Sequence, residues 1–416
     1  MRDNRIPWGM VVIVLIAAAL AGLTWFNYRF AVQNPGGNDF LARWMGARKW
    51  LMEGISPYDE RVSLATQQMI YGHPADPAQG EDKNYFVYPL YSMVFFAPFG
   101  LLDFVLARAL WMTLLEVSLV ALVFASLRVA AWRVSPWRAA ALVLFTVLWY
   151  HGVRTLILGQ FAGIGALLIA LSLLFIRQEQ DVPAGILLAL ATSKPQMVVL
   201  LVPFVLLWAL SRRRMRLIAG FLGGFGGLML VSLALIPNWP LQMLFQILEY
   251  PSYTAYTGLD SPLSYIAGLA PGISRTLNGV LHVALGLYLL VEWVLAWGKD
   301  ERWFVWAACM TLVVTNLVAY RTATTNYLAL LPALFLIFRV WEQRWKSVGR
   351  GLVWFSLAAL LVGLWALFLS TIQGNQEHPV MYLPLPLFAL IGLWWVRWWA
   401  VRPPRLLLEE FAARLG

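Results

Sequence analysis

The sequence has few charged residues and almost no cysteine. Only 12% of its 416 residues are charged, whereas 61% are hydrophobic. A soluble domain carries roughly 25% charged residues, so the polar surface that a soluble protein of this length needs is missing. The single cysteine, Cys309, lies in an apolar run. This excludes an intrachain disulfide and argues against redox chemistry.

Several sequence motifs of common enzyme classes are also missing. There is no Gly-x-x-x-x-Gly-Lys-Ser/Thr loop, which argues against ATP hydrolysis. There is neither a His-Glu-x-x-His motif nor a Cys/His cluster, and no Asp-x-Asp pair precedes residue 88. We therefore expect no metal site and no other cofactor. The glycine-rich run 223–227 lies inside an apolar segment, where it favours close helix packing over nucleotide binding.

Long apolar runs, by contrast, recur along the whole chain. The first is Trp8–Phe26, and others lie at about 88–103, 104–127, 139–151, 156–176, 183–193, 196–211, 217–236, 276–297, 303–319, 326–339, 351–370 and 380–399. Such runs are typical of transmembrane helices. They predict an all-α polytopic membrane protein with about 12 transmembrane helices and both ends in the cytoplasm. The first run is too long for a cleaved signal peptide and is expected to be retained.

The positive charge, formally +10, gathers in some of the short connections between these runs. The basic connections contain Arg128–Arg138, Arg177, Arg212–Arg216, Lys299–Arg302, Arg344–Arg350 and Arg397–Arg405. The others lie around Arg154 and Arg321 and at Pro237–Ser274 and Thr371–Pro379, and are nearly free of Lys and Arg. The two kinds alternate, so the positive-inside rule places the basic set in the cytoplasm. The long hydrophilic segment 28–87 is then outside.

Residues 1–402 are predicted to form one transmembrane domain, and Pro403-Pro404 begins a cytoplasmic tail, 403–416. Two segments resist simple counting. Tyr88–Asp103 is broken by prolines and is predicted to enter the membrane without fully crossing it. Val182–Ser211 must leave the cytoplasm and return to it across Ser193-Lys194-Pro195. Its first arm, 183–193, is shorter than a crossing requires, so Lys194 is predicted to lie at a turn within the membrane, where irregular backbone must be buried or line a wet cavity.

Asp39 is the first of the polar residues that stand close to the predicted outer face. It follows Gly36-Gly37-Asn38 and precedes a helix-like run, Phe40–Glu53, that ends at Gly54. An aspartate in this position could cap the helix by accepting backbone N–H groups. It could also be a carboxylate base that faces an outward cavity.

Cations accompany this carboxylate. Lys194 would hold an anion at the helix break, or else extend to an interface. Arg154, with Gln160 nearby, and Arg321 lie within the short outer connections. Arginine is suited to bidentate phosphate contact, although anchoring to lipid headgroups would explain both residues as well. One carboxylate and several cations suit a lipid phosphate as ligand and a hydroxyl as proton donor.

The order of several short motifs is more specific than any of them alone. They are Asp39-Phe40, Glu53-Gly54-Ile55-Ser56-Pro57-Tyr58, Phe86-Val87-Tyr88-Pro89-Leu90, Gly159-Gln160, and Ala184-Gly185 leading to Lys194-Pro195-Gln196. Over roughly residues 8–340 this order resembles glycosyltransferase family 87 of the GT-C superfamily. That family includes polyprenyl-phosphate-mannose-dependent mannosyltransferases. The resemblance implies a GT-C-type bundle with a long first outer loop.

The resemblance also implies an activity. An inverting hexosyltransferase would move a sugar, mannose above all, from a polyprenyl-phosphate donor to a lipid or glycan acceptor on the non-cytoplasmic side of the cell membrane. Asp39 matches the catalytic base, which takes the proton of the acceptor hydroxyl. Lys194 and Gln160 match the Lys-Pro and Gly-Gln positions. Together with Arg154 and Arg321 they are expected to bind the donor phosphate, where cations stabilise the developing charge.

Some contacts and alternatives stay open at this stage. Tyr58 and Tyr88 could stack on sugar rings or pack the outer segment onto the membrane. Family members often carry a histidine in a late loop and an asparagine after Gly-Gln, whereas this chain has Tyr320-Arg321-Thr322 and Ala162. The sugar is therefore undetermined. A transporter or lipid flippase would show inverted repeats, and a polysaccharide polymerase or ligase would place its largest outer loop late in the chain. No nucleic-acid partner is expected.

Overall fold

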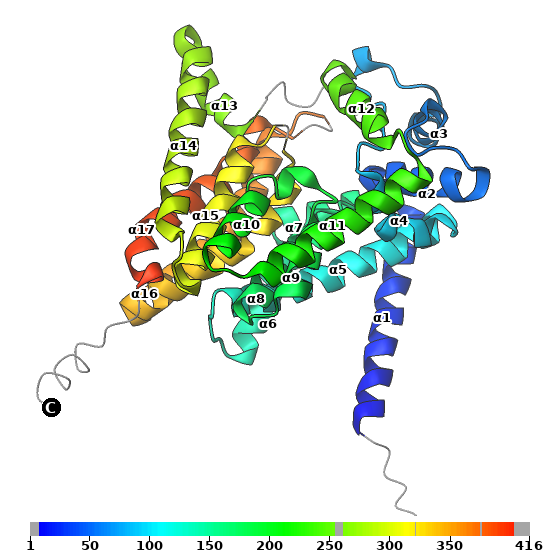
Figure 1. Ribbon diagram of the computed structural model, residues 1–416. Coiled ribbons are helices and arrows are strands. Elements are labelled where there is room, and N and C mark those ends of the chain that lie inside the picture. The colour runs from blue at the N-terminus through cyan, green and yellow to red at the C-terminus, as the bar shows by residue number, and fades with distance from the viewer. Residues whose placement is uncertain (1–7, 254–260, 321, 375–376, 403–416) are drawn as a thin grey trace, which may run out of the picture. The chain divides into compact units, whose positions relative to one another are not determined.

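The computed structural model describes residues 8–253, 261–320, 322–374 and 377–402. The described chain consists of α-helices and short 3₁₀ helices and contains no β-strand in these ranges (Figure 1). It divides into two compact units. Unit 1 comprises residues 1–119, 153–161 and 228–255, and unit 2 comprises residues 120–152, 162–227 and 256–416. The all-helical class predicted from the apolar runs is confirmed.

Unit 1 carries the long hydrophilic segment. Its elements are α1 (Trp8–Gln33), α2 (Asn38–Glu53), α3 (Glu60–Tyr71), η1 (Pro77–Gln79), η2 (Leu90–Ser92), α4 (Met93–Gly100), the first part of α5 (Phe104–Val129), the end of α7 (Tyr150–Leu158), the end of α11 (Met215–Leu235) and α12 (Trp239–Tyr253). The segment 28–87 is thus largely helical, and α2 packs against α3 and α4.

Helix α12 holds the hydrophilic segment 28–87 through polar side chains on one of its faces. Gln242, Gln246 and Glu249 are spaced so that they share a face of the helix. Gln242 accepts a hydrogen bond from Ser56 Oγ at 2.9 Å, and Glu249 binds Lys83 Nζ at 2.6 Å. Between them, the side chain of Gln246 donates to the carbonyl of Tyr58 (3.0 Å) and accepts from the backbone N–H of Val87 (3.2 Å). These contacts satisfy backbone groups that the irregular segment cannot pair with itself.

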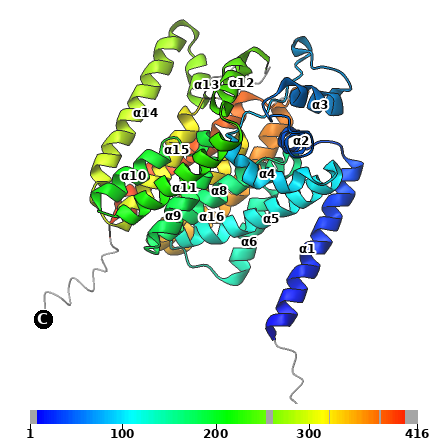
Figure 2. The same ribbon diagram turned by 45° about the vertical axis from the view of Figure 1, so that its right-hand side comes forward.

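Unit 2 contains most of the apolar helices. Besides the remaining parts of α5, α7 and α11, its elements are α6 (Pro136–Leu148), α8 (Ala162–Arg177), α9 (Asp181–Ala191), η3 (Pro195–Met197), α10 (Leu201–Ser211), α13 (Pro262–Gly268), η4 (Pro271–Ile273), α14 (Ser274–Ala296), α15 (Glu301–Val318), η5 (Thr324–Leu330), α16 (Leu331–Thr371), η6 (Pro379–Tyr382) and α17 (Pro384–Val401). The buried helix α15 packs against α10, α14, α16 and α17, as Figures 1 and 2 both show.

The number of membrane crossings is lower by length than the sequence predicts. Six helical segments are long and apolar enough to span a membrane, or seven if α6 and α7 together form one span. Four apolar helices are shorter: Leu90–Gly100, α8, α9 and α10. The predicted count of about 12 is therefore not confirmed. The short segment at Leu90–Gly100 agrees with the expectation that residues 88–103 do not fully cross.

One of the six segments is long enough for two crossings. It runs over 48 residues, Thr324–Thr371, whereas a single crossing needs about 20. Within it, Lys346 leaves helical geometry with a φ of 45°. A Cβ atom on Gly349 would lie 2.0 Å from the carbonyl oxygen of Trp341, so only glycine allows this close approach. The break coincides with the basic connection predicted around Arg344–Arg350.

The segment Val182–Ser211 forms two short antiparallel arms in unit 2. Helices α9 and α10 have 11 residues each, or roughly 16 Å of helix at 1.5 Å per residue. Both arms have one end beside Arg214, whose side chain forms an ion pair with Asp181 and whose backbone N–H donates to the carbonyl of Ala209. Lys194 lies at the opposite end, at the break between the arms. The predicted turn at Lys194 is therefore present.

The basic connections of unit 2 meet at one end of that unit. Arg177 donates to the carbonyls of Arg128 and Val129, and Arg339 to that of Ala130. Arg138 pairs with Glu342, and Arg302 donates to the carbonyl of Arg402. Arg212 donates to the carbonyl of Gly298. We call this the basic end; it brings together the loops that the charge pattern assigns to one side of the membrane.

Candidate functional site

Asp39 lies in the first turn of α2, in unit 1, but it does not cap this helix. The N-cap is Gly37, which adopts a left-handed conformation with a φ of 74° and makes no side-chain cap. The capping role considered for Asp39 is therefore wrong. A Cβ on Gly37 would lie 2.7 Å from Arg108 Nε, and Arg108 also donates to the carbonyl of Asn34. This packing requires glycine before α2 and leaves the Asp39 carboxylate 31% exposed.

Arg43, one helical turn after Asp39, lies close to both the backbone carbonyl and the side-chain carboxylate of Asp39. Its Nη1 atom donates to the carbonyl of Asp39 at 2.9 Å and lies 3.9 Å from a carboxylate oxygen of the same residue. The guanidinium stands 4.6 Å above the ring centroid of Tyr88. Arg43 is only 9% exposed. The sequence analysis did not single it out, although the i,i+4 spacing of Asp39 and Arg43 is a recognisable signal.

Asp82 adds a second carboxyl group to this cluster. Burial raises the pKa of the Asp82 carboxyl; the negative charge of Asp39 raises it further, whereas Arg43 lowers it. The backbone N–H of Asn84 donates to the carboxylate at 2.6 Å, and the backbone of Asp82 is paired with the hydroxyl of Tyr71. Asp82 thus lies close enough to Asp39 and Arg43 to sense both charges. No sequence signal pointed to it, because it stands in an irregular loop.

The two tyrosines proposed as sugar-stacking residues are buried in unit 1. Tyr58 donates a hydrogen bond of 2.5 Å to the carbonyl of Tyr88, and its ring packs against Phe86. The ring of Tyr88 contacts Phe96 and Phe161 and supports Arg43. Burial raises the pKa of Tyr88 to about 12. Of the two roles that the sequence left open, this geometry favours packing for Tyr58 and support of Arg43 for Tyr88.

The Gly159-Gln160 motif lies directly against the start of α2. Gly159 has a φ of 69°, and a Cβ there would stand 2.6 Å from the Cβ of Phe40, the neighbour of Asp39. The carbonyl of Gly159 accepts a hydrogen bond from Trp111 Nε1 at 2.9 Å, and Trp111 stacks on Phe40. Gln160 is buried beside Phe161, the ring that packs on Tyr88. Two motifs far apart in the sequence therefore adjoin.

Lys194 belongs to unit 2 and occupies the position before η3. It is 2% exposed, and the preceding residues Thr192 and Ser193 are buried as well. Both η3 and η5 pack against α15. Arg154 belongs to unit 1 and is partly buried. Arg321 lies outside the described residues.

A buried acid that the sequence analysis missed lies in the same unit as Lys194. Glu377 is 3% exposed and accepts hydrogen bonds from the hydroxyl of Tyr150 at 2.7 Å and from Thr324 Oγ1 at 3.1 Å. Thr324 and Glu377 lie in two connections that are nearly free of Lys and Arg, and Tyr150 lies at the end of the apolar run that precedes a third. The sequence shows Glu377 as the acidic residue of the connection Thr371–Pro379, but nothing in the sequence indicated its partners.

Together, unit 1 presents a partly exposed carboxylate beside a fixed guanidinium, and unit 2 presents a buried cation at a helix break. The first can accept a proton from a hydroxyl group, and the second can bind an anion. Within the described ranges, no group of three or more His, Cys, Asp or Glu side chains is close enough to hold a metal ion.

Comparison with known proteins adds one match. The model of glycosyltransferase family 87 matches residues 86–319, which is more than half of the chain. The matched range contains Gly159-Gln160 and Lys194 but not Asp39 or Tyr58. Neither a curated protein nor a solved structure matches the chain.

Proposed function

We propose, from the premise that the chain belongs to glycosyltransferase family 87, that it transfers mannose from a polyprenyl-phosphate donor to a lipid or glycan acceptor. Membership makes the chain a membrane glycosyltransferase. The identity of the sugar, the lipid donor and the inverting outcome are the proposed refinements. Asp39 is the proposed general base.

The chemistry requires one base and one anion site. Asp39 takes the proton of the acceptor hydroxyl while the oxygen of that hydroxyl attacks the anomeric carbon of the donor sugar. The bond between that carbon and the phosphate oxygen breaks. The electron pair of this bond stays on the phosphate oxygen, and the phosphate leaves still attached to its polyprenyl chain. A phosphate needs no proton to leave, so no second carboxyl is required as an acid, in contrast to glycoside hydrolysis.

The contact between Gly159 and Phe40 carries this proposal. It joins the Gly-Gln motif, which lies within the residues matched to the family, to the helix turn that holds Asp39. Asp39 is also partly exposed and is held next to Arg43. A carboxylate that is reachable and oriented is what a general base must be.

Binding of the donor phosphate is assigned chiefly to Lys194. A cation that is buried at a helix break is well suited to stabilise a phosphate, because its attraction for the anion is screened less there than in water. Lys194 is the proposed donor-binding cation, and Gln160, Arg154 and Arg321 are proposed to contribute. The basic end of unit 2 is assigned to the cytoplasm and the opposite end, with Lys194, toward the other face of the cell membrane.

Transfer assays with matched variants test the proposal. Purified protein receives radiolabelled polyprenyl-phosphate mannose and a membrane lipid extract. Asp39→Asn is expected to lower the rate by about 10²–10⁴-fold, the contribution typical of a general base. Glu60→Gln, an equal charge change at an exposed position of α3 outside the motifs of the resemblance, is expected to leave the rate unchanged.

Two outcomes would contradict the proposal at different levels. If the folded Asp39→Asn protein keeps the full rate, Asp39 is not the base. If the wild type transfers no sugar from any polyprenyl-linked donor, the alternative of a transporter or lipid flippase gains support. Uptake of labelled lipid into sealed vesicles then provides the direct measurement for that alternative.

A further inference from the structure

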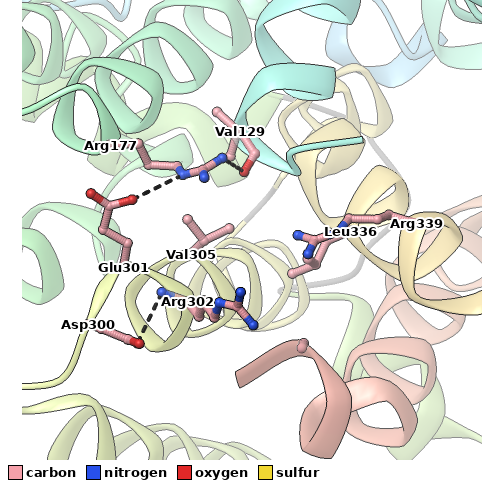
Figure 3. A pocket seen from close by; sticks show the side chains of 9 residues that line it. Val129, Arg177, Asp300, Glu301, Arg302, Val305, Leu336 and Arg339 are labelled. Carbon is pink, nitrogen blue, oxygen red and sulfur yellow. Dashed lines mark hydrogen bonds and ion pairs between the residues drawn. The ribbon is translucent and has the colours of Figure 1, made fainter. Parts of the chain in front are cut away.

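The basic end of unit 2 encloses a cavity of about 300 Å³ that the proposed glycosyl transfer does not use. Its charged lining consists of Arg177, Arg302, Arg339, Asp300 and Glu301, with an apolar wall of Val129, Val305, Leu336 and Ala400. Figure 3 shows the three guanidinium groups around one central space, carried by different elements.

The positive charge at this cavity is only partly neutralised. Glu301 lies 3.6 Å from Arg177, and Asp300 accepts backbone N–H groups of Arg302 and Trp303 at the start of α15. Arg302 and Arg339 form hydrogen bonds to backbone carbonyls, those of Arg402 and Ala130. The buried Nε of Arg339 makes no hydrogen bond within the part of the chain that the structure describes. Two guanidinium groups thus lack a carboxylate partner there.

Two adjoining cavities extend the site. One of about 330 Å³ shares Arg177 and is also lined by Arg128 and Arg133. The other, about 320 Å³, shares Arg339 and Arg133. Glu342 lines this last cavity but is already paired with Arg138. Neighbouring cavities thus share lining residues, and across the three of them arginines outnumber carboxylates; we call them together the basic groove.

The apolar walls indicate what kind of anion fits. Leu127, Trp132 and Leu174 line the second cavity, so hydrocarbon surface adjoins the guanidinium groups. A soluble anion uses only the charged part, whereas an anionic lipid uses both. Arginine binds phosphate oxygens through two parallel N–H groups, and basic pockets between transmembrane helices are known sites for lipid headgroups.

We propose that this basic groove binds the phosphate group of an anionic membrane lipid, with Arg302 and Arg339 as the principal contacts. The site is separate from Lys194, which lies at the other end of α9 and α10. It does not depend on which sugar or donor the protein uses. A headgroup with two phosphates would engage adjacent cavities at once.

Native mass spectrometry of the full-length protein tests the assignment. The protein is titrated with cardiolipin, phosphatidylglycerol, zwitterionic phosphatidylcholine and inorganic phosphate. The Arg302→Gln/Arg339→Gln double variant loses two charged hydrogen bonds to the phosphate and is therefore expected to bind the anionic lipids at least about tenfold more weakly. Arg216→Gln removes the same type of charge at an exposed position near the basic end and is expected to bind as the wild type does.

The outcomes separate the sources of the phosphate. Preference for anionic lipid that the double variant loses supports the proposal. In a second outcome, the wild type shows no preference for anionic lipid, while the double variant loses only the binding of inorganic phosphate. That result identifies a soluble phosphate as the ligand and overturns the lipid assignment. Equal binding of every probe by wild type, double variant and Arg216→Gln overturns the site altogether. If the double variant unfolds, Arg302→Gln alone decides, because the Arg302 side chain is partly exposed and its one hydrogen bond among the described residues is to the Arg402 carbonyl.

Discussion

Arg43 determines how the Asp39 carboxylate is presented. Its guanidinium donates to the Asp39 carbonyl and lies over the face of Tyr88, whereas its buried Nε makes no hydrogen bond among the described residues. The 3.9 Å separation from the carboxylate is longer than a direct hydrogen bond. Arg43 therefore lies beside Asp39 without a direct hydrogen bond to the carboxylate, which agrees with the proposed role of this carboxylate as the base.

Asp82 gives this cluster a pH dependence that can be measured as stability. Its pKa is raised in the folded protein from 3.8. The folded state therefore holds the proton more tightly, and the contribution of Asp82 to stability falls as pH rises from about 3.8 through the raised pKa. Asp82→Asn removes the charge and keeps an acceptor for Asn84. Its melting temperature relative to the wild type is expected to be lowest near pH 4 and to increase toward neutral pH.

Asp76, in the same irregular segment, provides a control of opposite sign. Hydrogen bonds from Gln79 and from the backbone of Ala78 lower its pKa. Its contribution is therefore present above pH 3.8 and is lost as pH falls through the lowered pKa. Asp76→Asn should be less stable than the wild type at neutral pH, with a difference that vanishes in acid. A melting-temperature difference for Asp82→Asn that does not change with pH would show that Asp82 is not held as described.

Lys194 is expected to act on the donor alone. Lys194→Gln removes the charge and should raise the donor concentration required for half-maximal rate by about tenfold or more, since a charged hydrogen bond is lost. The requirement for acceptor should change much less. Steady-state kinetics with each substrate varied separately measure this.

Two further variants serve as controls for the Lys194→Gln measurement. Lys194→Met cannot bind phosphate but fills similar space, so it distinguishes loss of charge from loss of packing. Lys299→Gln removes an exposed lysine at the basic end and should change neither substrate requirement. Full activity of Lys194→Gln at limiting donor would mean that the phosphate binds elsewhere.

At the level of elements, the turn at Gly159 is where two motifs are brought into contact. Gly159→Ala places a methyl group into Phe40 at a φ of 69°. Strain and overpacking together are expected to cost about 2–4 kcal/mol and to displace the start of α2. Melting temperature and transfer rate should both fall in the same assay conditions.

A matched glycine shows whether the effect is local. Gly223 lies in α11 with no atom within 4 Å of an added Cβ, so Gly223→Ala should be neutral or slightly stabilising. If Gly159→Ala were as stable and active as Gly223→Ala, the contact between the Gly-Gln motif and α2 would not matter for the site.

Helix α12 is a second element whose role lies in contacts between distant segments. Its stripe of Gln242, Gln246 and Glu249 pairs with Ser56, the Tyr58 and Val87 backbone, and Lys83. In the sequence this helix is only part of a long connection between apolar runs. Its role in holding the segment 28–87 depends on contacts with residues that are distant in the sequence, so only the tertiary structure shows it.

For the molecule as a whole, the distribution of charge predicts which ends face which side of the membrane. Cys309 is buried, so single cysteines introduced at exposed sites should react against a low background. We expect Gln68→Cys and Tyr320→Cys to react with a membrane-impermeant maleimide in intact cells, and Arg216→Cys only after permeabilisation. The reverse pattern would invert the proposed orientation and place Asp39 in the cytoplasm.

Periodicity and local patterns predicted much of the fold, because they are local properties. Gly54 ends α2 where expected, and the break at Lys194 follows from two short apolar arms around a Lys-Pro pair. The number of membrane crossings was predicted less accurately, because an apolar run in the sequence does not distinguish a full crossing from a shorter helix such as α9 or α10.

The candidate site was predictable only in part. Asp39 could be singled out because it is a carboxylate at the start of a predicted helix, shortly after two glycines. Arg43 and Asp82 did not, because their importance comes from the ring of Tyr88 and from a loop that folds back. Tyr58 was expected to meet a sugar as readily as to pack, and burial of its hydroxyl against the Tyr88 carbonyl depends on contacts between segments.

The sequence by itself determined that this is an all-helical membrane protein, which connections share a charge type, and that it resembles family 87. Hydrophobic length and charge are properties of each segment alone. The tertiary structure decided that Gly37 and not Asp39 caps α2, and that Gly159 touches Phe40. It also decided that arginines of three separate helices, α8, α15 and α16, line one cavity. Each of these depends on close approach between distant segments, which no local pattern encodes.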